Sequence, residues 1–148
     1  MAGAATGLLS LVIVTPAGSV TKSEVTEVQA PGVMGEFGVL PGHIPFLSVI
    51  GAGVLTYVEG GTHRVLAVGP GYVEVGTGEN VVVLTESSAT PDEIDLAAVT
   101  QEEQEATVAL AQLSPAEQAA EHSHKSAVQA WARARREAVE RGRAGAAH

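Results

Sequence analysis

Short apolar runs separated by turn-forming residues fill the N-terminal part of the chain. They predict strands near residues 8–15, 20–29, 46–50, 53–59, 62–68, 71–75 and 80–85, with shorter strands within 33–45. Gly60-Gly61 predicts a tight hairpin, and residues 76–80 predict a second turn. About ten short strands at such close spacing are typical of a β-sandwich or flattened barrel.

The pattern changes to that of helices at Thr90-Pro91-Asp92-Glu93, where threonine, proline and glutamate form a capping box. Ser114 and Glu117 repeat this signal, so we predict helices over about 91–112 and 115–142. Apolar positions at helical spacing on the first are Ala106, Ala109, Leu110 and Leu113. A mixed stripe on the second consists of Val128, Trp131, Ala132, Arg135, Ala138 and Val139.

The short link between the helices predicts an antiparallel hairpin. The fold class is therefore α+β, with an all-β sandwich over residues 1–89 and a two-helix hairpin over 90–148. The contact faces of the helices are mostly alanine, and each missing methylene removes roughly 0.8 kcal/mol of burial. We therefore expect the hairpin to dock weakly on the sandwich and to be able to leave it.

The composition argues against several classes of protein. The chain of 148 residues has no cysteine, which excludes disulfides and thiolate chemistry. Its apolar runs are far shorter than the about 20 residues of a spanning helix, and we expect no secretory signal or transit peptide. A net charge of −9 with few aromatic residues argues against nucleic acid as a partner.

Enzyme chemistry is not indicated either. His43 and His63 are well separated along the β part. His122 and His124 are two residues apart, so they do not lie on the same face of a helix. The sequence has no Gly-x-Ser-x-Gly nucleophile elbow and no phosphate-binding loop of the Gly-x-x-x-x-Gly-Lys type. We expect a non-catalytic protein without a metal or other cofactor.

Charge is segregated along the hairpin, with −8 over residues 92–121 and +4 over 122–148. Two interpretations stay open. The helix faces attract each other as ordinary solvated surfaces, or the basic end seeks an acidic partner. The arginines concerned are Arg133, Arg135, Arg136 and Arg141.

Residues 35–47, GEFGVLPGHIPFL, resemble a characteristic segment of the epsilon subunits of F-type ATP synthases, and residues 67–75 resemble that family's strand pair with a central glycine turn. The resemblance implies a rotor subunit at the foot of the central stalk, bound to the gamma subunit and to the polar loops of the c-ring. It also implies a hairpin that folds on the sandwich or extends along gamma to the catalytic head and blocks ATP hydrolysis. Mitochondrial delta subunits share the fold.

The resemblance implies an interface with the c-ring and gamma at Glu36, Phe37, Val39, Leu40, Pro41, Gly42 and His43. Glu36 would meet a basic or polar c-ring loop, or else be a solvated carboxylate. His43 would lie at the contact region, or else hydrogen-bond within its own turn. The residues Phe37, Val39 and Leu40 belong either to the core or to the interface.

Some bacterial members bind ATP through Ile/Leu-Asp-x-x-Arg-Ala. Ile94 and Asp95 match this motif, but Ala98 stands in place of the arginine, so we expect weak or no ATP binding. Asp95 also suits a helix N-terminus. The resemblance implies a peripheral location at the cytoplasmic face of a bacterial plasma membrane. The alternative is a free-standing β-sandwich adaptor with a helical tail.

Overall fold

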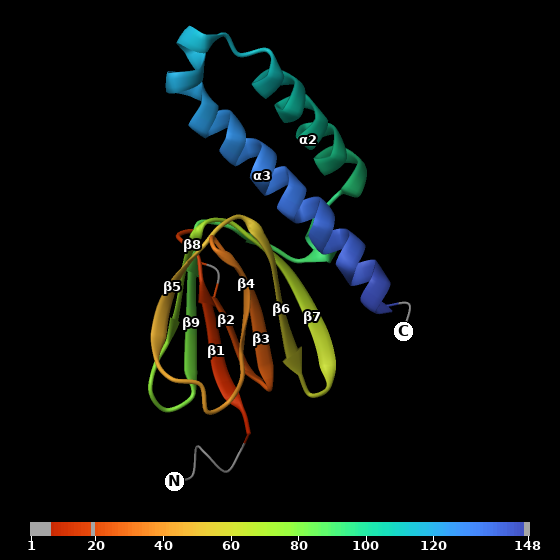
Figure 1. The fold of residues 1–148 in the computed structure, drawn as a ribbon. Helices are drawn as coiled ribbons and strands as arrows, with labels where there is room; N and C mark the ends of the chain where they lie inside the picture. The colour runs from red at the N-terminus through yellow and green to blue at the C-terminus, as the bar shows by residue number, and fades with distance from the viewer. Residues whose placement is uncertain (1–6, 19, 147–148) are drawn as a thin grey trace.

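The computed structural model describes residues 7–18 and 20–146. These form an N-terminal β-sandwich and two long helices at one end of it (Figure 1), which confirms the predicted α+β architecture. The strands are β1 (Leu9–Val14), β2 (Val20–Val25), β3 (Glu27–Gly32), β4 (Gly35–Val39), β5 (Phe46–Ile50), β6 (Gly53–Glu59), β7 (Thr62–Val68), β8 (Gly71–Val75), β9 (Asn80–Thr85) and β10 (Ser88–Ala89). The helices are the 3-10 helix η1 (Pro91–Glu93), α2 (Leu96–Ala111) and α3 (Pro115–Ala146).

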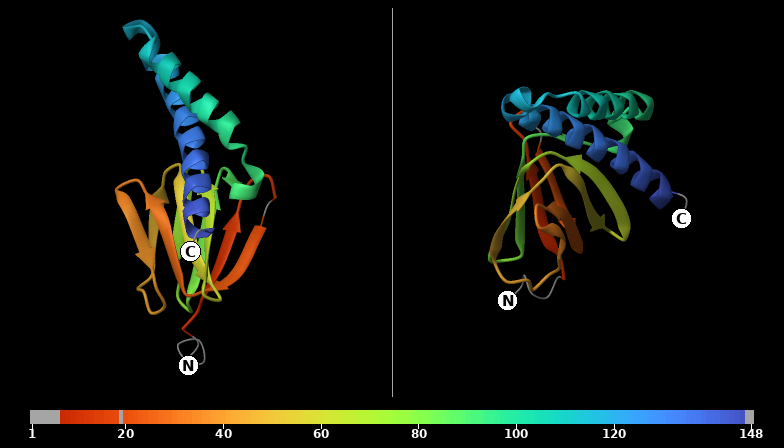
Figure 2. Two further views of the ribbon diagram at one scale, coloured as in Figure 1. Left: turned by 90° about the vertical axis from the view of Figure 1, so that its right-hand side faces the viewer. Right: turned by 45° about the horizontal axis from the view of Figure 1, so that its top comes forward.

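The strands form two layers that enclose one core (Figure 2). One layer runs in the order β5-β8-β9-β1-β2 and the other in the order β10-β7-β6-β3, with β4 beside β3. Alternate residues point inward, as in β1, where Leu9, Leu11 and Ile13 are buried. They pack in one apolar cluster with residues of the other layer, such as Val28 and Leu55.

The single strand predicted over residues 20–29 is wrong, because two strands lie there. β2 ends at Val25 and β3 begins at Glu27. Between them, the amide of Thr26 donates a hydrogen bond to the carbonyl of Val58 at the end of β6. This break lets the chain leave the layer of β1 and enter the layer of β6. Propensity alone contains no signal for such a change of layer.

The predicted start of the first helix at residue 91 is also wrong. Thr90 makes no side-chain capping bond, and only the short η1 follows it. Ile94 is extended and packs against the cluster of Val54, Ala67 and Ala138. The true cap of α2 is Asp95, whose carboxylate accepts a hydrogen bond from the amide of Ala98. Burial of Ile94 therefore outweighs the local capping signal.

The second capping box is confirmed. The side chain of Glu117 accepts hydrogen bonds from the amide and hydroxyl of Ser114, and α3 begins between them at Pro115. The helix runs to Ala146 rather than to the predicted residue 142. It lies between α2 and the sheet (Figure 2). Its Trp131 and Ala138 pack on the cluster that includes Val54 and Ala67. The predicted antiparallel hairpin is thus docked through α3.

Candidate functional site

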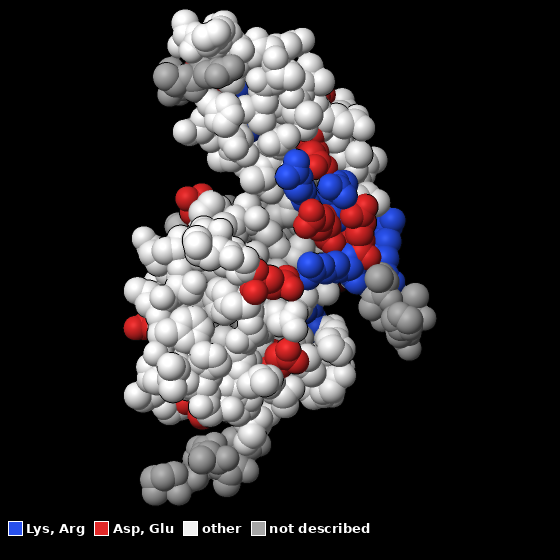
Figure 3. Space-filling model, in the orientation of Figure 1, with Lys and Arg blue, Asp and Glu red and all other residues white. Residues whose placement is uncertain are grey.

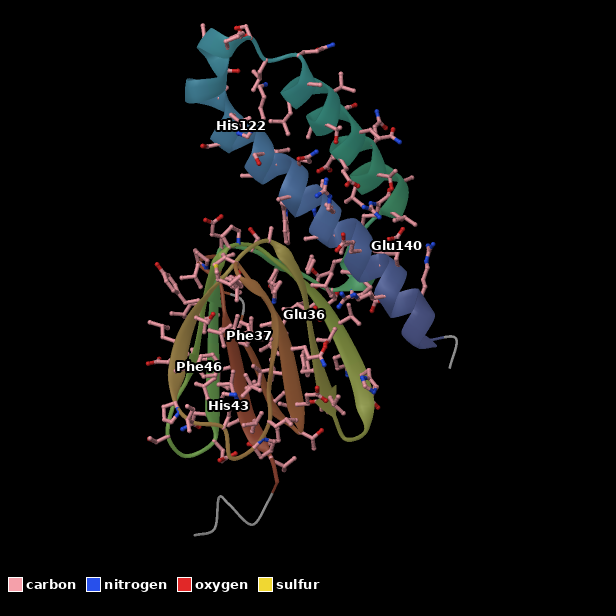
Figure 4. All side chains as sticks on the ribbon, viewed as in Figure 1. Glu36, Phe37, His43, Phe46, His122 and Glu140 are labelled. Carbon is pink, nitrogen blue, oxygen red and sulfur yellow. The ribbon has the colours of Figure 1, made fainter. Side chains whose placement is uncertain are left out.

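The residues of the predicted interface are spread along the sandwich instead of forming one patch. Glu36 is the second residue of β4 and lies close to α3, whereas His43 follows β4 toward the far end of the sandwich (Figure 4). An extended chain rises about 3.3 Å per residue, so the intervening strand separates the two side chains widely. Any partner that meets both residues must therefore cover most of the length of β4.

Glu36 pairs with the hairpin. Its carboxylate lies 3.6 Å from Nη1 of Arg141 in α3, and each side chain is about half exposed. An exposed pair of this kind contributes on the order of 0 to 1 kcal/mol, so it stabilises the docked position of the helix only slightly. Glu36 is thus the point at which the predicted interface and the helical hairpin touch.

The apolar members of the predicted interface divide between core and surface. Val39 is fully buried, and Phe37 packs edge-on against Phe46 with ring centroids 5.6 Å apart. Leu40 is exposed at 55%. The ambiguity of the sequence at these positions is therefore resolved as core for Phe37 and Val39, and surface for Leu40.

Residues 40–44, called here the 40–44 loop, lie in the connection between β4 and β5. The amide of His43 donates to the carbonyl of Leu40, and its Nδ1 lies 3.0 Å from the carbonyl oxygen of Ile44. The imidazole also lies 5.0 Å, between centroids, from the ring of Phe46. His43 therefore makes the local contacts of its own turn, while Ile44 is exposed at 74%.

Sequence reasoning missed an exposed apolar row on the outer face of the sandwich. The strand register places Val49, Tyr72, Leu84 and Val14 side by side across β5, β8, β9 and β1. Tyr72 is exposed at 51% and Leu84 at 49%. Leu47, at 66%, extends the row along β5, and a groove beside it is lined by Pro16 and Pro70. The signal was available, since FLSVI and NVVVLT are apolar at outward as well as inward positions.

Three of the four arginines are bound inside the hairpin. Arg133 Nε lies 3.0 Å and Arg136 Nε 2.5 Å from carboxylate oxygens of Glu103 on α2. Arg135 lies 2.5 Å from Glu102 and also stacks over the ring of Trp131. Basic and acidic side chains accordingly alternate in one cluster where the helices meet (Figure 3). The mutual attraction of the two helices is the interpretation that these contacts favour.

The cluster perturbs Glu103. The hydrogen bond from Arg136, and then that from Arg133, lowers the pKa of the Glu103 carboxyl below its usual range, although partial burial opposes the shift. The side chain of Glu103 is 14% exposed, so the two guanidinium groups largely replace water around its carboxylate. Glu103 is thus the central anion of the contact between α2 and α3.

Ile94 and Asp95, which match the ATP-binding motif, have structural roles. Ile94 packs against the cluster beneath α3, and Asp95 caps α2. Within residues 7–18 and 20–146, no three acidic, histidine or cysteine side chains gather as a metal site.

Comparisons with known proteins identify the family of the chain. The family model for the β-sandwich domain of the ATP synthase delta/epsilon chain matches residues 8–91. The ATP synthase epsilon chain 2 of Syntrophotalea carbinolica is 45% identical over 109 residues, which cover 74% of this chain and 78% of the relative. The epsilon chain of Anaeromyxobacter dehalogenans is 42% identical over 119 residues, covering 80% and 88%.

Two solved structures share the fold. A chain of the Euglena gracilis mitochondrial ATP synthase (OSCP/F1/c-ring) superposes with a TM-score of 0.67 at 21% identity, covering 96% of this chain and 82% of that one. A chain of the Tetrahymena thermophila central stalk and c-ring gives 0.57 at 14% identity, covering 86% and 96%. With the family match spanning the whole sandwich and the relatives reaching into the helices, the chain belongs to the family of ATP synthase delta/epsilon chains.

Proposed function

We propose that the chain is a central-stalk subunit of the rotor of an F-type ATP synthase. It couples rotation of the c-ring, through the gamma subunit, to ATP synthesis in the catalytic head. It performs no catalysis itself and works as a peripheral part of the complex at the cytoplasmic face of a bacterial plasma membrane. Family membership supports this role. Of the described residues, no helix is long and apolar enough to span a membrane.

The exposed apolar row is the observation that carries the proposal. Monomeric proteins seldom expose contiguous apolar surface unless it binds a partner. The row crosses rigid strands and is bordered by a shallow groove, so it offers a fixed surface of the kind that transmits force. We assign the row to gamma, and the 40–44 loop together with Glu36 to the polar loops of the c-ring.

Substitution within the row tests this assignment. Leu84→Glu places a charge on the outer face of β9 without entering the core, because Val83 and Thr85 are the inward residues there. We expect at least about tenfold weaker binding to ATP synthase depleted of this subunit, as for loss of a central interface side chain. Val108→Glu is the matched control, because Val108 is similarly exposed, at 54%, on α2.

Equal binding of the Leu84 and Val108 variants would remove the row from the interface. Failure of the unmodified chain to bind at all would favour the free-standing adaptor. The assay uses purified full-length chain and depleted membranes, and measures the dissociation constant by sedimentation.

We further propose that the hairpin restrains ATP hydrolysis when it extends along gamma to the head, where Arg133, Arg135, Arg136 and Arg141 meet acidic loops. The docking cluster is small, which supports a hairpin that can detach. To meet those loops, Arg133, Arg135 and Arg136 exchange their pairs with Glu102 and Glu103 for acidic groups of the head. The Arg141–Glu36 pair breaks as well, because it joins the hairpin to the sandwich.

A further inference from the structure

Glu79 has an unusual backbone. In the part of the chain that the structure describes, it is the one residue other than glycine with a positive φ, at 65°. It lies in the β8–β9 turn next to Gly78, whose φ is 78°. Glycine, asparagine and aspartate normally occupy such positions, because a longer side chain is disfavoured in the left-handed region. An observed outlier of this kind points to a contact that compensates it.

The side chain of Glu79 makes that contact with a different loop. Both carboxylate oxygens accept from the amide of Gly42, at 3.0 and 2.9 Å. The carbonyl oxygen of Glu79 also accepts from the amide of Ser10 at 2.8 Å. A single residue thus connects the start of β1, the β8–β9 turn and the 40–44 loop, which are distant in sequence.

The turn does not depend on the carboxylate for its own closure. The amide of Gly76 donates to the carbonyl of Asn80 at 2.9 Å, and Asn80 Nδ2 donates to the carbonyl of Thr77 at 3.0 Å. Both bonds involve atoms outside the Glu79 side chain. The side chain therefore serves the neighbouring 40–44 loop and not the turn that carries it.

The 40–44 loop gains most from this bond. Gly42 is at its centre with a φ of 87°, and a Cβ there would meet nothing within 4 Å. The amide of His43 closes a turn onto Leu40. The exposed side chains of Leu40 and Ile44 flank this turn, so fixing the Gly42 amide fixes how the two are presented.

We propose that Glu79 is a positioning residue that holds the 40–44 loop in its binding conformation before the partner arrives. A loop ordered in advance loses less entropy on binding and so binds more tightly. Glu79 acts through the Gly42 amide and does not need to touch the partner. The inference rests on the proposed function in one respect, since the partner of this loop is taken to be the polar surface of the c-ring.

The first test reads the contact itself in the isolated full-length chain. Glu79→Gly removes the carboxylate and suits the positive φ, so the fold is retained. We expect the Gly42 amide resonance to shift and its hydrogen exchange to accelerate about tenfold, as for loss of one exposed charge-assisted bond. Glu79→Gln keeps one acceptor oxygen and should restore part of the protection. Glu24→Gln, an exposed carboxylate on β2, is the charge-matched control and should change neither quantity.

The second test measures binding of the same variants to ATP synthase depleted of this subunit. We expect about tenfold weaker binding for Glu79→Gly, an intermediate value for Glu79→Gln, and the unmodified value for Glu24→Gln. An unchanged Gly42 amide in Glu79→Gly would disprove the contact. A released amide with unchanged affinity would disprove the positioning role. If the unmodified chain did not bind, the proposed function would fail and the positioning role with it. The amide measurement would still test the contact between the Glu79 carboxylate and the Gly42 amide, because it does not depend on binding.

Discussion

Glu103 binds Arg133 and Arg136 at once, and this single carboxylate is a main link between α2 and α3. Replacing it by glutamine removes the anion that Arg133 pairs with and leaves Arg136 paired with Glu140 alone. We expect Glu103→Gln to lower the free energy of unfolding of the helices by about 1 kcal/mol, since all three groups keep some contact with water. Urea unfolding followed by circular dichroism at 222 nm measures this change. Glu105→Gln on the same helix, where Glu105 bonds only Gln101 among the described residues, should change it little.

The effect of Glu103 depends on pH in a defined direction. Its pKa is lowered in the folded chain, so its contribution is fully present above the ordinary carboxyl value of about 4.3. The contribution is lost as the pH falls through the lowered pKa. The stability difference between the unmodified chain and Glu103→Gln should therefore be constant near neutral pH and disappear in acid. A difference that persisted in acid would show that the carboxylate charge is not its cause.

The sequence indicated the arginines by their segregation from the acidic residues, and it left open whether they bind a partner or the other helix. It could not indicate Arg141 opposite Glu36, because that pair depends on where α3 crosses the sheet. The exposed row of Tyr72 and Leu84 likewise depends on register between strands. The sequence thus indicated which residues are charged or apolar and where they lie along the chain, but not which of them pair across different elements.

Secondary structure followed the sequence wherever one local signal acted alone. Period-two alternation marked β1 and β9, and the Ser114–Glu117 box marked the start of α3. The failures lie at Thr26 and Thr90, where a long-range backbone bond and the burial of Ile94 decide the conformation. Local propensity contributes less free energy than such tertiary contacts, so the sequence pattern did not predict these two boundaries.

The docking of α3 depends on the small size of Ala138. This residue is fully buried against Val54 and Ala67, so Ala138→Asp would place a carboxylate without a partner in an apolar cluster. We expect the hairpin to leave the sandwich while the β-core stays folded. The only tryptophan, Trp131, packs against this cluster, so its emission should move to longer wavelength.

Ala127→Asp provides the control for this prediction, because Ala127 is exposed on the same helix and the helix propensity changes equally. Its emission should match that of the unmodified chain. Identical spectra for the two variants would mean that the Ala138 contact does not hold the hairpin.

In the whole molecule, the apolar cluster that joins the hairpin to the sandwich is separate from the main core of the sandwich. The main core consists of strand residues alone, whereas α3 docks through a second, smaller cluster that includes Val54 and Ala138. Removal of the helices would expose little of the main core, so residues 1–90 should fold without them. This division is what allows one chain to remain bound through its sandwich while its hairpin changes position.

The separation makes the regulatory role of the hairpin directly measurable. We expect the detached catalytic head, reconstituted with residues 1–90, to hydrolyse ATP faster than with the full chain at equal occupancy, because the arginines of α3 are then absent. Charge reversal at Arg133 and Arg136 in the full chain should also relieve inhibition, provided that their pairs with Glu103 open when the hairpin extends. Equal rates for the long and short forms would leave the sandwich as the working part and α3 as a passive appendage. If hydrolysis is faster with residues 1–90 but unchanged by charge reversal, the restraint comes from the bulk of the hairpin and not from its arginines.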